Sequence, residues 1–192
     1  MSQAALTGAG NEFGQSIEYA DPSELIAGID QALVISDTHW FHDNVVAYCD
    51  RPAHHDVLML SNWYETVGPS DLVLHCGDVA VGVAAEVLPE RLPSLPGRIF
   101  LIRGNHDYGK RLRQYVSRGW SVVEPFEAEY RGWTVRFSHK PIPDLPPRTL
   151  NVHGHIHTRP APSAAHINVS VEQIDYRPVR LSELLDRAIA RL

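Results

Sequence analysis

The first half of the chain alternates short apolar runs with stretches whose apolar residues recur at helical spacing. The apolar runs, rich in Val, Ile and Leu, predict buried strands, and the spaced stretches predict helices. The strands are expected at residues 32–36, 72–76 and 98–102, and the helices at 54–67, 84–92 and 109–118. In the first helix the apolar spacing is carried by Val57, Leu60, Tyr64 and Val67. Such alternation is typical of parallel β-α-β units.

The second half has a different pattern, in which short strands follow one another without long helices between them. They are expected at residues 121–124, 126–130, 133–138, 149–153 and 165–171. Arg131-Gly132 predicts a tight hairpin, and leucines at helical spacing from Leu181 to Leu192 predict an amphipathic C-terminal helix. The whole pattern predicts two facing sheets with helices outside each, in one domain covering residues 31–192. Residues 1–30 show weak periodicity and are expected to be an arm or a variable edge segment.

Composition and charge limit the class of protein. The 192 residues suffice for one domain, and 44% hydrophobic with 21% charged residues is an ordinary globular balance. No apolar run approaches the ~20 residues that span a bilayer, residues 1–14 do not resemble a secretory signal, and Cys49 and Cys76 form no disulfide framework. We therefore expect a cytoplasmic protein without a membrane partner. The net charge of −6 disfavours extended nucleic acid but not a nucleotide.

Five short polar motifs follow one another along the domain, most of them directly after a predicted strand. They are Asp37-Thr38-His39, Gly77-Asp78, Gly104-Asn105-His106-Asp107, His139 and Gly154-His155-Ile156-His157. Polar side chains at successive strand ends converge on one edge of a sheet, and these residue types are metal ligands. The set is too large for one ion. It suits two ions about 3.5–4 Å apart that share an aspartate.

This order of motifs resembles that of the calcineurin-like metallophosphoesterases, and the chain looks like a small, stand-alone bacterial or phage member. The resemblance runs from about Val34 to beyond His157 and includes the less diagnostic stretches 37–44 and 62–63. It implies a four-layer α/β/β/α sandwich of two facing mixed sheets flanked by helices. It also implies a metal-dependent phosphoric ester hydrolase.

The resemblance assigns the ligands by position: Asp37, His39 and His157 to one ion, Asn105, His139 and His155 to the other, and Asp78 between them. A hydroxide bridging the two ions would be the nucleophile. His106 would bind the phosphate and protonate the leaving oxygen as the catalytic acid. Asn105 is also expected to contact the substrate. The mixed ligands fit manganese, which we expect to support activity, and equally iron, zinc, nickel or cobalt.

Three neighbouring residues keep two interpretations each. Asp107 precedes a predicted helix, so it could cap that helix or orient the site. His42, three residues after His39, could contact the phosphate or lie on the surface. Arg103 could reach a substrate phosphate, although arginines at strand ends are usually solvated.

The substrate is expected to be a small phosphate ester, with phosphodiesters favoured and nucleotide-like or cyclic nucleotide molecules plausible. One alternative is a phosphomonoesterase with the same mechanism. Another is a non-catalytic metal-binding scaffold, which the presence of His106 disfavours. A nuclease acting on longer nucleic acid would need a basic track beside the site, which the acidic balance disfavours. The oligomeric state is not predicted.

Overall fold

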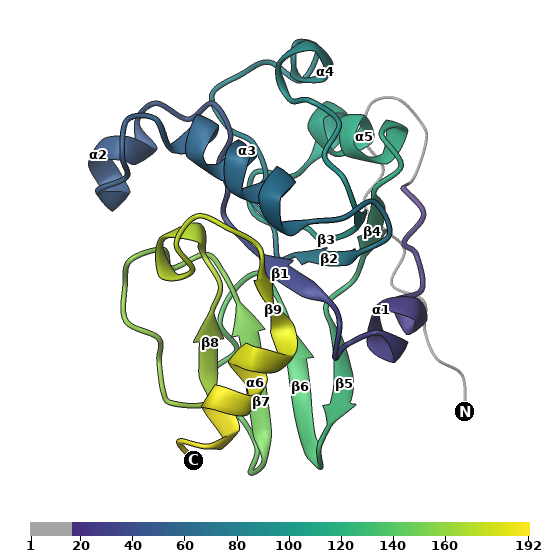
Figure 1. Cartoon of the computed structure of the whole chain (residues 1–192), viewed down its shortest axis with the longest axis vertical. Helices are drawn as coiled ribbons and strands as arrows, with labels where there is room; N and C mark the ends of the chain where they lie inside the picture. Colours follow the sequence, from purple (N-terminus) through teal and green to yellow (C-terminus); the bar gives the residue numbers. More distant parts are fainter. Residues whose placement is uncertain (1–16) are drawn as a thin grey trace.

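The computed structural model describes residues 17–192, which build two β-sheets with helices packed against them (Figure 1). The first sixteen residues of the predicted N-terminal arm lie outside the described residues. The rest of that segment contains helix α1 (Ser23–Ala27) and buries Leu25 and Ile29 in the core between the sheets. This part of the predicted arm therefore packs against the domain.

The first sheet has the strand order β4-β3-β2-β1-β9. Its strands are β1 (Leu33–Ile35), β2 (Leu72–His75), β3 (Arg98–Ile102), β4 (Ser121–Val123) and β9 (Val179–Arg180). Strands β1 to β4 pair in parallel, and β9 is antiparallel to β1. Strands β1, β2 and β3 confirm the predicted β-α-β units. The strand predicted at 121–124 was grouped with the second half of the chain, but as β4 it pairs with β3 in the first sheet. The two-residue β9 was not predicted, because so short a strand has no periodicity to detect.

The second sheet has the strand order β5-β6-β7-β8. Its strands are β5 (Phe126–Tyr130), β6 (Trp133–Phe137), β7 (Thr149–His153) and β8 (His166–Asn168). The predicted hairpin joins β5 to β6, with Arg131 and Gly132 both in the left-handed region. Strands β6, β7 and β8 are parallel. Strand β8 is shorter than predicted, because the chain turns into the one-turn helix η1 (Val171–Gln173).

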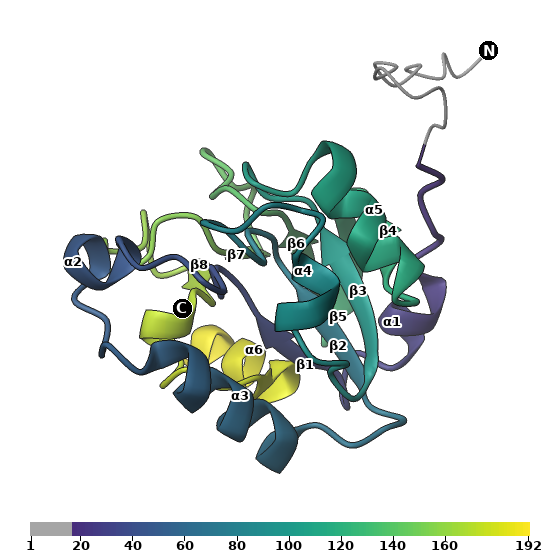
Figure 2. The ribbon, with the colours of Figure 1, turned by 90° about the horizontal axis from the view of Figure 1, so that it is seen from above.

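Within residues 17–192 the fold has five further α-helices: α2 (Val45–Cys49), α3 (His55–Thr66), α4 (Leu88–Arg91), α5 (Gly109–Ser117) and α6 (Leu181–Ile189). Helices α3, α4 and α5 lie over the first sheet (Figure 2). Their buried side chains pack on the face of that sheet that points away from the second sheet. Helix α6 contacts β8 and β9. The mixed α/β class, with two sheets flanked by helices, is confirmed.

Two details of the predicted helices are wrong. The helix predicted at 84–92 begins only at Leu88, because Pro89 is tolerated in the first turn of a helix but not in its interior. Helix α3 has nearly the predicted bounds but a different buried face. Val57 is 69% exposed, whereas Met59 and Trp63 are buried against the first sheet. The helix is apolar around much of its circumference, so spacing alone did not identify the face that packs.

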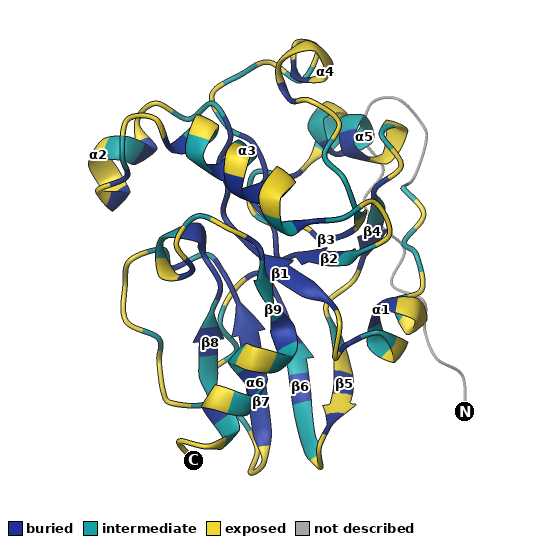
Figure 3. Cartoon of the chain, in the orientation of Figure 1, coloured by how far each residue is buried: buried dark blue, intermediate teal, exposed yellow. Residues whose placement is uncertain are grey.

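Apolar side chains fill two layers, one between the sheets and one between the first sheet and α3 to α5. Every residue of β1 and β7 is buried, as Figure 3 shows. Parallel strands covered on both faces form a rigid support for the loops that leave their carboxyl ends. At that edge the two sheets are joined directly. Ser36 forms a parallel β-bridge with Ser170, and the Val171 N–H donates to the Ser36 carbonyl (3.1 Å).

No helix among residues 17–192 is long and apolar enough to cross a membrane.

Candidate metal centre

The loop after β1 and the loop after β7 bring together Asp37, His39 and His157, which could hold one metal ion. Asp37 Oδ1 lies 3.9 Å from Nε2 of each histidine. The other carboxylate oxygen, Oδ2, accepts from the His155 backbone N–H (2.8 Å) and from Ser170 Oγ (3.0 Å), which fixes the direction of Oδ1. Burial alone would raise the pKa of Asp37, but the surrounding imidazoles lower it to about 2, so the carboxylate is ionised.

The loop after β2, together with the loops after β6 and β7, forms the other group, Asp78, His139 and His155. His139 donates from Nδ1 to the Cys76 carbonyl (2.8 Å), so the lone pair of the neutral ring is on Nε2, where it can bind a cation. That Nε2 atom lies 3.3 Å from Asp78 Oδ2. The Asn105 amide, from the loop after β3, is 3.0 Å from His155 Nδ1. The structure thus brings together all seven side chains that the sequence predicted as ligands.

Asp78 lies between the two groups. Its Oδ2 is 3.6 Å from His39 Nε2 in the first group and 3.3 Å from His139 Nε2 in the second. Its Oδ1 is held by the His106 backbone N–H at 2.8 Å. Burial opposes ionisation, but His139 and His39 hold the pKa of Asp78 well below its usual range. One carboxylate oxygen therefore faces both histidines.

Unpartnered polar atoms show that these residues fit a cation. Asp37 Oδ1, His39 Nε2 and His139 Nε2 are buried and have no hydrogen-bond partner among residues 17–192. Buried polar atoms almost always have partners, and leaving one unpaired costs about 1–3 kcal/mol. Imidazole nitrogens and carboxylate oxygens that converge in this way are the donor set of transition-metal sites. The chemistry of the cluster therefore matches divalent cations.

The loops that carry these side chains have unusual backbone conformations. Five of the clustered residues have φ between 47° and 70°: Asp37, His39, Asp78, His155 and His157. Such left-handed conformations are uncommon outside glycine and concentrate at functional sites, where the surroundings impose them. Here the loops after β1 and β2 are tied together, because the Asp37 N–H donates to the Gly77 backbone carbonyl and the His39 N–H donates to the Asp78 backbone carbonyl. The strain is thus compensated by hydrogen bonds between the loops.

Two glycines of the motifs are required by close packing. A Cβ atom at Gly104 would overlap the Asp78 backbone and carboxylate, and one at Gly154 would overlap the side chains of Ser36 and Asp37. Only glycine allows two backbones to approach this closely. These glycines let the loops after β3 and β7 bring their ligands next to the two aspartates.

Asp107 supports the loops that carry the ligands. It does not cap α5, whose N-cap residue is Tyr108. It is 1% exposed. Its Oδ2 accepts from the backbone N–H groups of Asp78 (2.6 Å) and Gly104 (2.9 Å), and Oδ1 accepts from that of Val79 (3.1 Å). Burial and the nearby Asp78 raise the pKa of Asp107 to about 6, although these three donors partly oppose the shift. Asp107 therefore joins the loop after β2 to the loop after β3.

The remaining predicted residues differ in how close they lie to the cluster. The His106 ring is partly exposed, and its centroid is 5.4 Å from that of His39. Burial lowers the pKa of His106. His42 stacks on His39 with centroids 5.5 Å apart and planes at 21°. Arg103 is exposed, and its guanidinium lies over the Tyr19 ring at 5.4 Å.

Arg51 and Glu172 belong to the site but were missed by the sequence analysis. The Arg51 guanidinium donates to the carbonyl oxygens of Asp37 (2.6 Å) and Thr38 (2.8 Å) and, through Nε, to Glu172 (2.8 Å). Glu172 Oε1 in turn accepts from His157 Nδ1 at 3.0 Å. Glu172 follows the last strand run at the same sheet edge as the other motifs, so its position was a usable signal. Arg51 has no such signal in the sequence.

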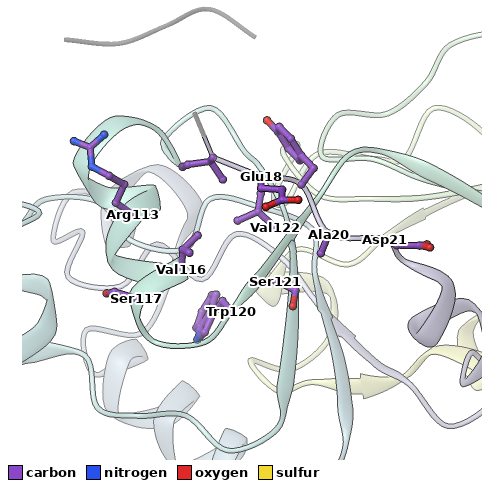
Figure 4. Close-up of a pocket in the computed structure, with 11 residues that line it drawn as sticks. Glu18, Ala20, Asp21, Arg113, Val116, Ser117, Trp120, Ser121 and Val122 are labelled. Atoms are coloured by element: carbon purple, nitrogen blue, oxygen red, sulfur yellow. The ribbon is translucent and has the colours of Figure 1, made fainter. Parts of the chain in front are cut away.

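A large cavity in the described part of the chain does not coincide with this cluster. It has a volume of about 800 Å³ and lies between residues 17–21 and helix α5, with Trp120 and Val122 in its wall (Figure 4). None of the predicted ligands lines it. The site is therefore recognised by its converging polar atoms and not by the volume of a cavity.

Comparison with known proteins agrees with this geometry. The chain is 34% identical over 166 residues to the uncharacterized protein MJ1445 of Methanocaldococcus jannaschii, covering 77% of this chain and 85% of that protein. A crystal structure of the protein of unknown function AQ665 from Aquifex aeolicus matches with a TM-score of 0.64 at 26% identity, covering 81% of this chain and 97% of that one. The model of the calcineurin-like phosphoesterase family matches residues 31–187, a span that includes every motif described above. The chain therefore belongs to the calcineurin-like phosphoesterases, a family of metal-dependent enzymes that hydrolyse phosphate esters.

Proposed function

We propose that this enzyme is a binuclear phosphodiesterase that acts on small, nucleotide-like esters. The observation that carries the proposal is the position of Asp78 Oδ2 between His39 and His139, one from each ligand group. A carboxylate oxygen that faces two groups of ligands suits a pair of ions that share it. The first ion would be held by Asp37, His39 and His157, and the second by Asn105, His139 and His155. Manganese is the ion we expect to support activity.

Two divalent cations held there would neutralise phosphoryl charge and supply a water of lowered pKa as the nucleophile. The chain itself supplies the remaining groups. His106 is the proposed acid, because its partly exposed ring lies beside His39 at the accessible side of the cluster. Its backbone N–H donates to Asp78 Oδ1, so His106 is held next to the aspartate that faces both ligand groups. A protonated His106 would give its proton to the leaving oxygen.

The rim of the cluster favours a substrate with an aromatic group. Tyr48 on α2 is 74% exposed, and its ring contacts His42 with centroids 6.4 Å apart. His42 stacks in turn on His39. Exposed tyrosine is a surface on which a nucleobase can stack, a contact worth about 1–3 kcal/mol per base in nucleic-acid-binding proteins. A nucleotide whose phosphate is at the metal centre would therefore find an aromatic surface next to it.

Hydrolysis of matched synthetic esters tests this proposal. The protein is stripped of metal, reloaded with manganese, and given an aryl phosphodiester or the corresponding monoester. We expect metal-dependent turnover, faster with the diester, and loss of turnover in Asp78→Asn but not in Asp144→Asn, which changes an exposed residue of the proline-rich loop. Faster turnover of the monoester would favour a phosphomonoesterase. No turnover of either ester, with two ions bound, would favour a metal-binding scaffold.

A further inference from the structure

We propose that Arg51 and Glu172 form a buried ion pair that positions Asp37 and His157 and thereby sets the metal affinity of one of the two sites. Neither residue belongs to the five motifs. The side chains of Arg51 and Glu172 are 0% and 3% exposed, and their charged atoms approach to 2.7 Å. The inference rests on the metal centre of the proposed function, but it concerns metal binding and not the substrate.

Glu172 fixes the orientation of the His157 ring. Because a carboxylate oxygen can only accept, His157 must donate from Nδ1 to Glu172 Oε1, at 3.0 Å. Nε2 is then the atom with a free lone pair, and it is the atom on the side of Asp37 Oδ1, 3.9 Å away. A carboxylate that holds the far nitrogen of a histidine ligand sets its tautomer and raises its basicity. Glu172 is placed to do both.

Arg51 holds the loop that carries Asp37, the other ligand of this metal site. Its two Nη atoms donate to the consecutive carbonyls of Asp37 and Thr38, within the loop where Asp37 and His39 adopt left-handed conformations. Its Nε donates to Glu172 Oε1, the same oxygen that accepts from His157. A planar guanidinium presents its N–H donors in a fixed fork that reaches three separate acceptors, whereas the three donors of a lysine ammonium sit on one nitrogen and rotate. One arginine therefore links the loop after β1 to the segment after β8.

The pair acts on one site and not on the other. The hydrogen bonds of Arg51 and Glu172 lead to Asp37, Thr38 and His157, whereas His139 in the second group is oriented by the Cys76 carbonyl. Glu172 also forms a group with Cys49 and His157 whose ligand atoms lie close together. The positive guanidinium on Glu172 disfavours a further cation there, so the carboxylate serves His157 instead.

Calorimetric titration of the metal-stripped, full-length protein with Mn²⁺ tests the proposal. The wild type is expected to show two binding events. In Glu172→Gln and in Arg51→Lys, one event should weaken about 10–100-fold, the usual effect of removing the partner of a histidine ligand, while the other keeps its affinity. The electron paramagnetic resonance signal of the coupled manganese pair should then appear only at higher metal concentration. For the affected ion, the double variant should lose less binding free energy than the sum of the two single losses, since both residues act through the same ligands.

Arg118→Lys is the matched control, because Arg118 also donates to several backbone carbonyls, those of Leu88, Pro89 and Leu92, but next to α4. It should bind both ions as the wild type does. Circular dichroism establishes independently that each variant is folded; if Glu172→Gln does not fold, Arg51→Lys decides. Wild-type affinity at both sites, or an equal loss at both sites in a folded variant, would overturn the proposal. Two bound ions without ester hydrolysis would refute the proposed function and leave this inference standing.

Discussion

Replacing Asp107 with asparagine tests how the site is supported. The carboxylate accepts three backbone N–H groups, from Asp78, Val79 and Gly104. An asparagine oxygen can keep the two bonds now made by Oδ2, but the amide nitrogen would then face the N–H of Val79, so two donors meet in a buried position. Leaving one buried donor unpaired costs about 1–3 kcal/mol. For a chain of this size that loss corresponds to a fall in Tm of roughly 2–12 °C.

The measurement is thermal unfolding followed by circular dichroism at pH 8. This pH is chosen because the pKa of Asp107 is raised to about 6, so the wild-type side chain is ionised. The exposed Asp144→Asn provides the control and should leave the Tm unchanged. Because Asp107 joins the loops of Asp78 and Gly104, Asp107→Asn should also weaken binding of both metal ions. A wild-type Tm together with wild-type metal affinity would show that these three hydrogen bonds do not support the site.

Three further perturbations have defined outcomes. His106→Ala should retain both ions but hydrolyse esters about 10²–10⁴-fold more slowly, with the larger loss for poor leaving groups, and equal rates on such a substrate would refute the acid assignment. Tyr48→Ala should raise KM for aryl or nucleotide esters but not for methyl esters, whereas Tyr64→Ala, which removes another exposed tyrosine, should change neither. Burial lowers the pKa of His75 to about 3, so the unfolded chain gains its proton near pH 6.5 while the folded chain does not. His75 should therefore contribute a fall in the free energy of unfolding of about 1.4 kcal/mol per pH unit below 6.5, and urea titrations of metal-free protein should show a fall that is shallower by this amount for His75→Gln.

Local sequence patterns predicted the parts of the fold that local interactions determine. Strands β1, β2 and β3 were found from their apolar runs, and the β5–β6 hairpin from Arg131-Gly132. Most of the ligand motifs were noticed because they follow a predicted strand and parallel strands end at one edge, whereas the assignment of each ligand to an ion came from the family resemblance. The same reasoning could not identify the buried face of α3, where Trp63 packs and Val57 does not, because that choice depends on the sheet beneath it.

The supporting residues of the site were harder to find, because their contacts are remote in sequence. Arg51 and Glu172 are 121 positions apart, and no spacing rule relates them. Asp107 lay inside a motif, but its sequence position could not distinguish a helix cap from a support for the neighbouring loop. Its three backbone partners, two of them near position 78, became visible only when the loops were placed together.

Under the proposed mechanism, two ions bridged by Asp78 are needed for ester hydrolysis. Its most direct test adds Mn²⁺ stepwise to the metal-stripped protein while measuring both the bound metal and the rate of aryl phosphodiester hydrolysis. The rate is expected to rise until two equivalents are bound, and Asp78→Asn is expected to show no such rise. Full activity after a single bound equivalent would contradict the binuclear site.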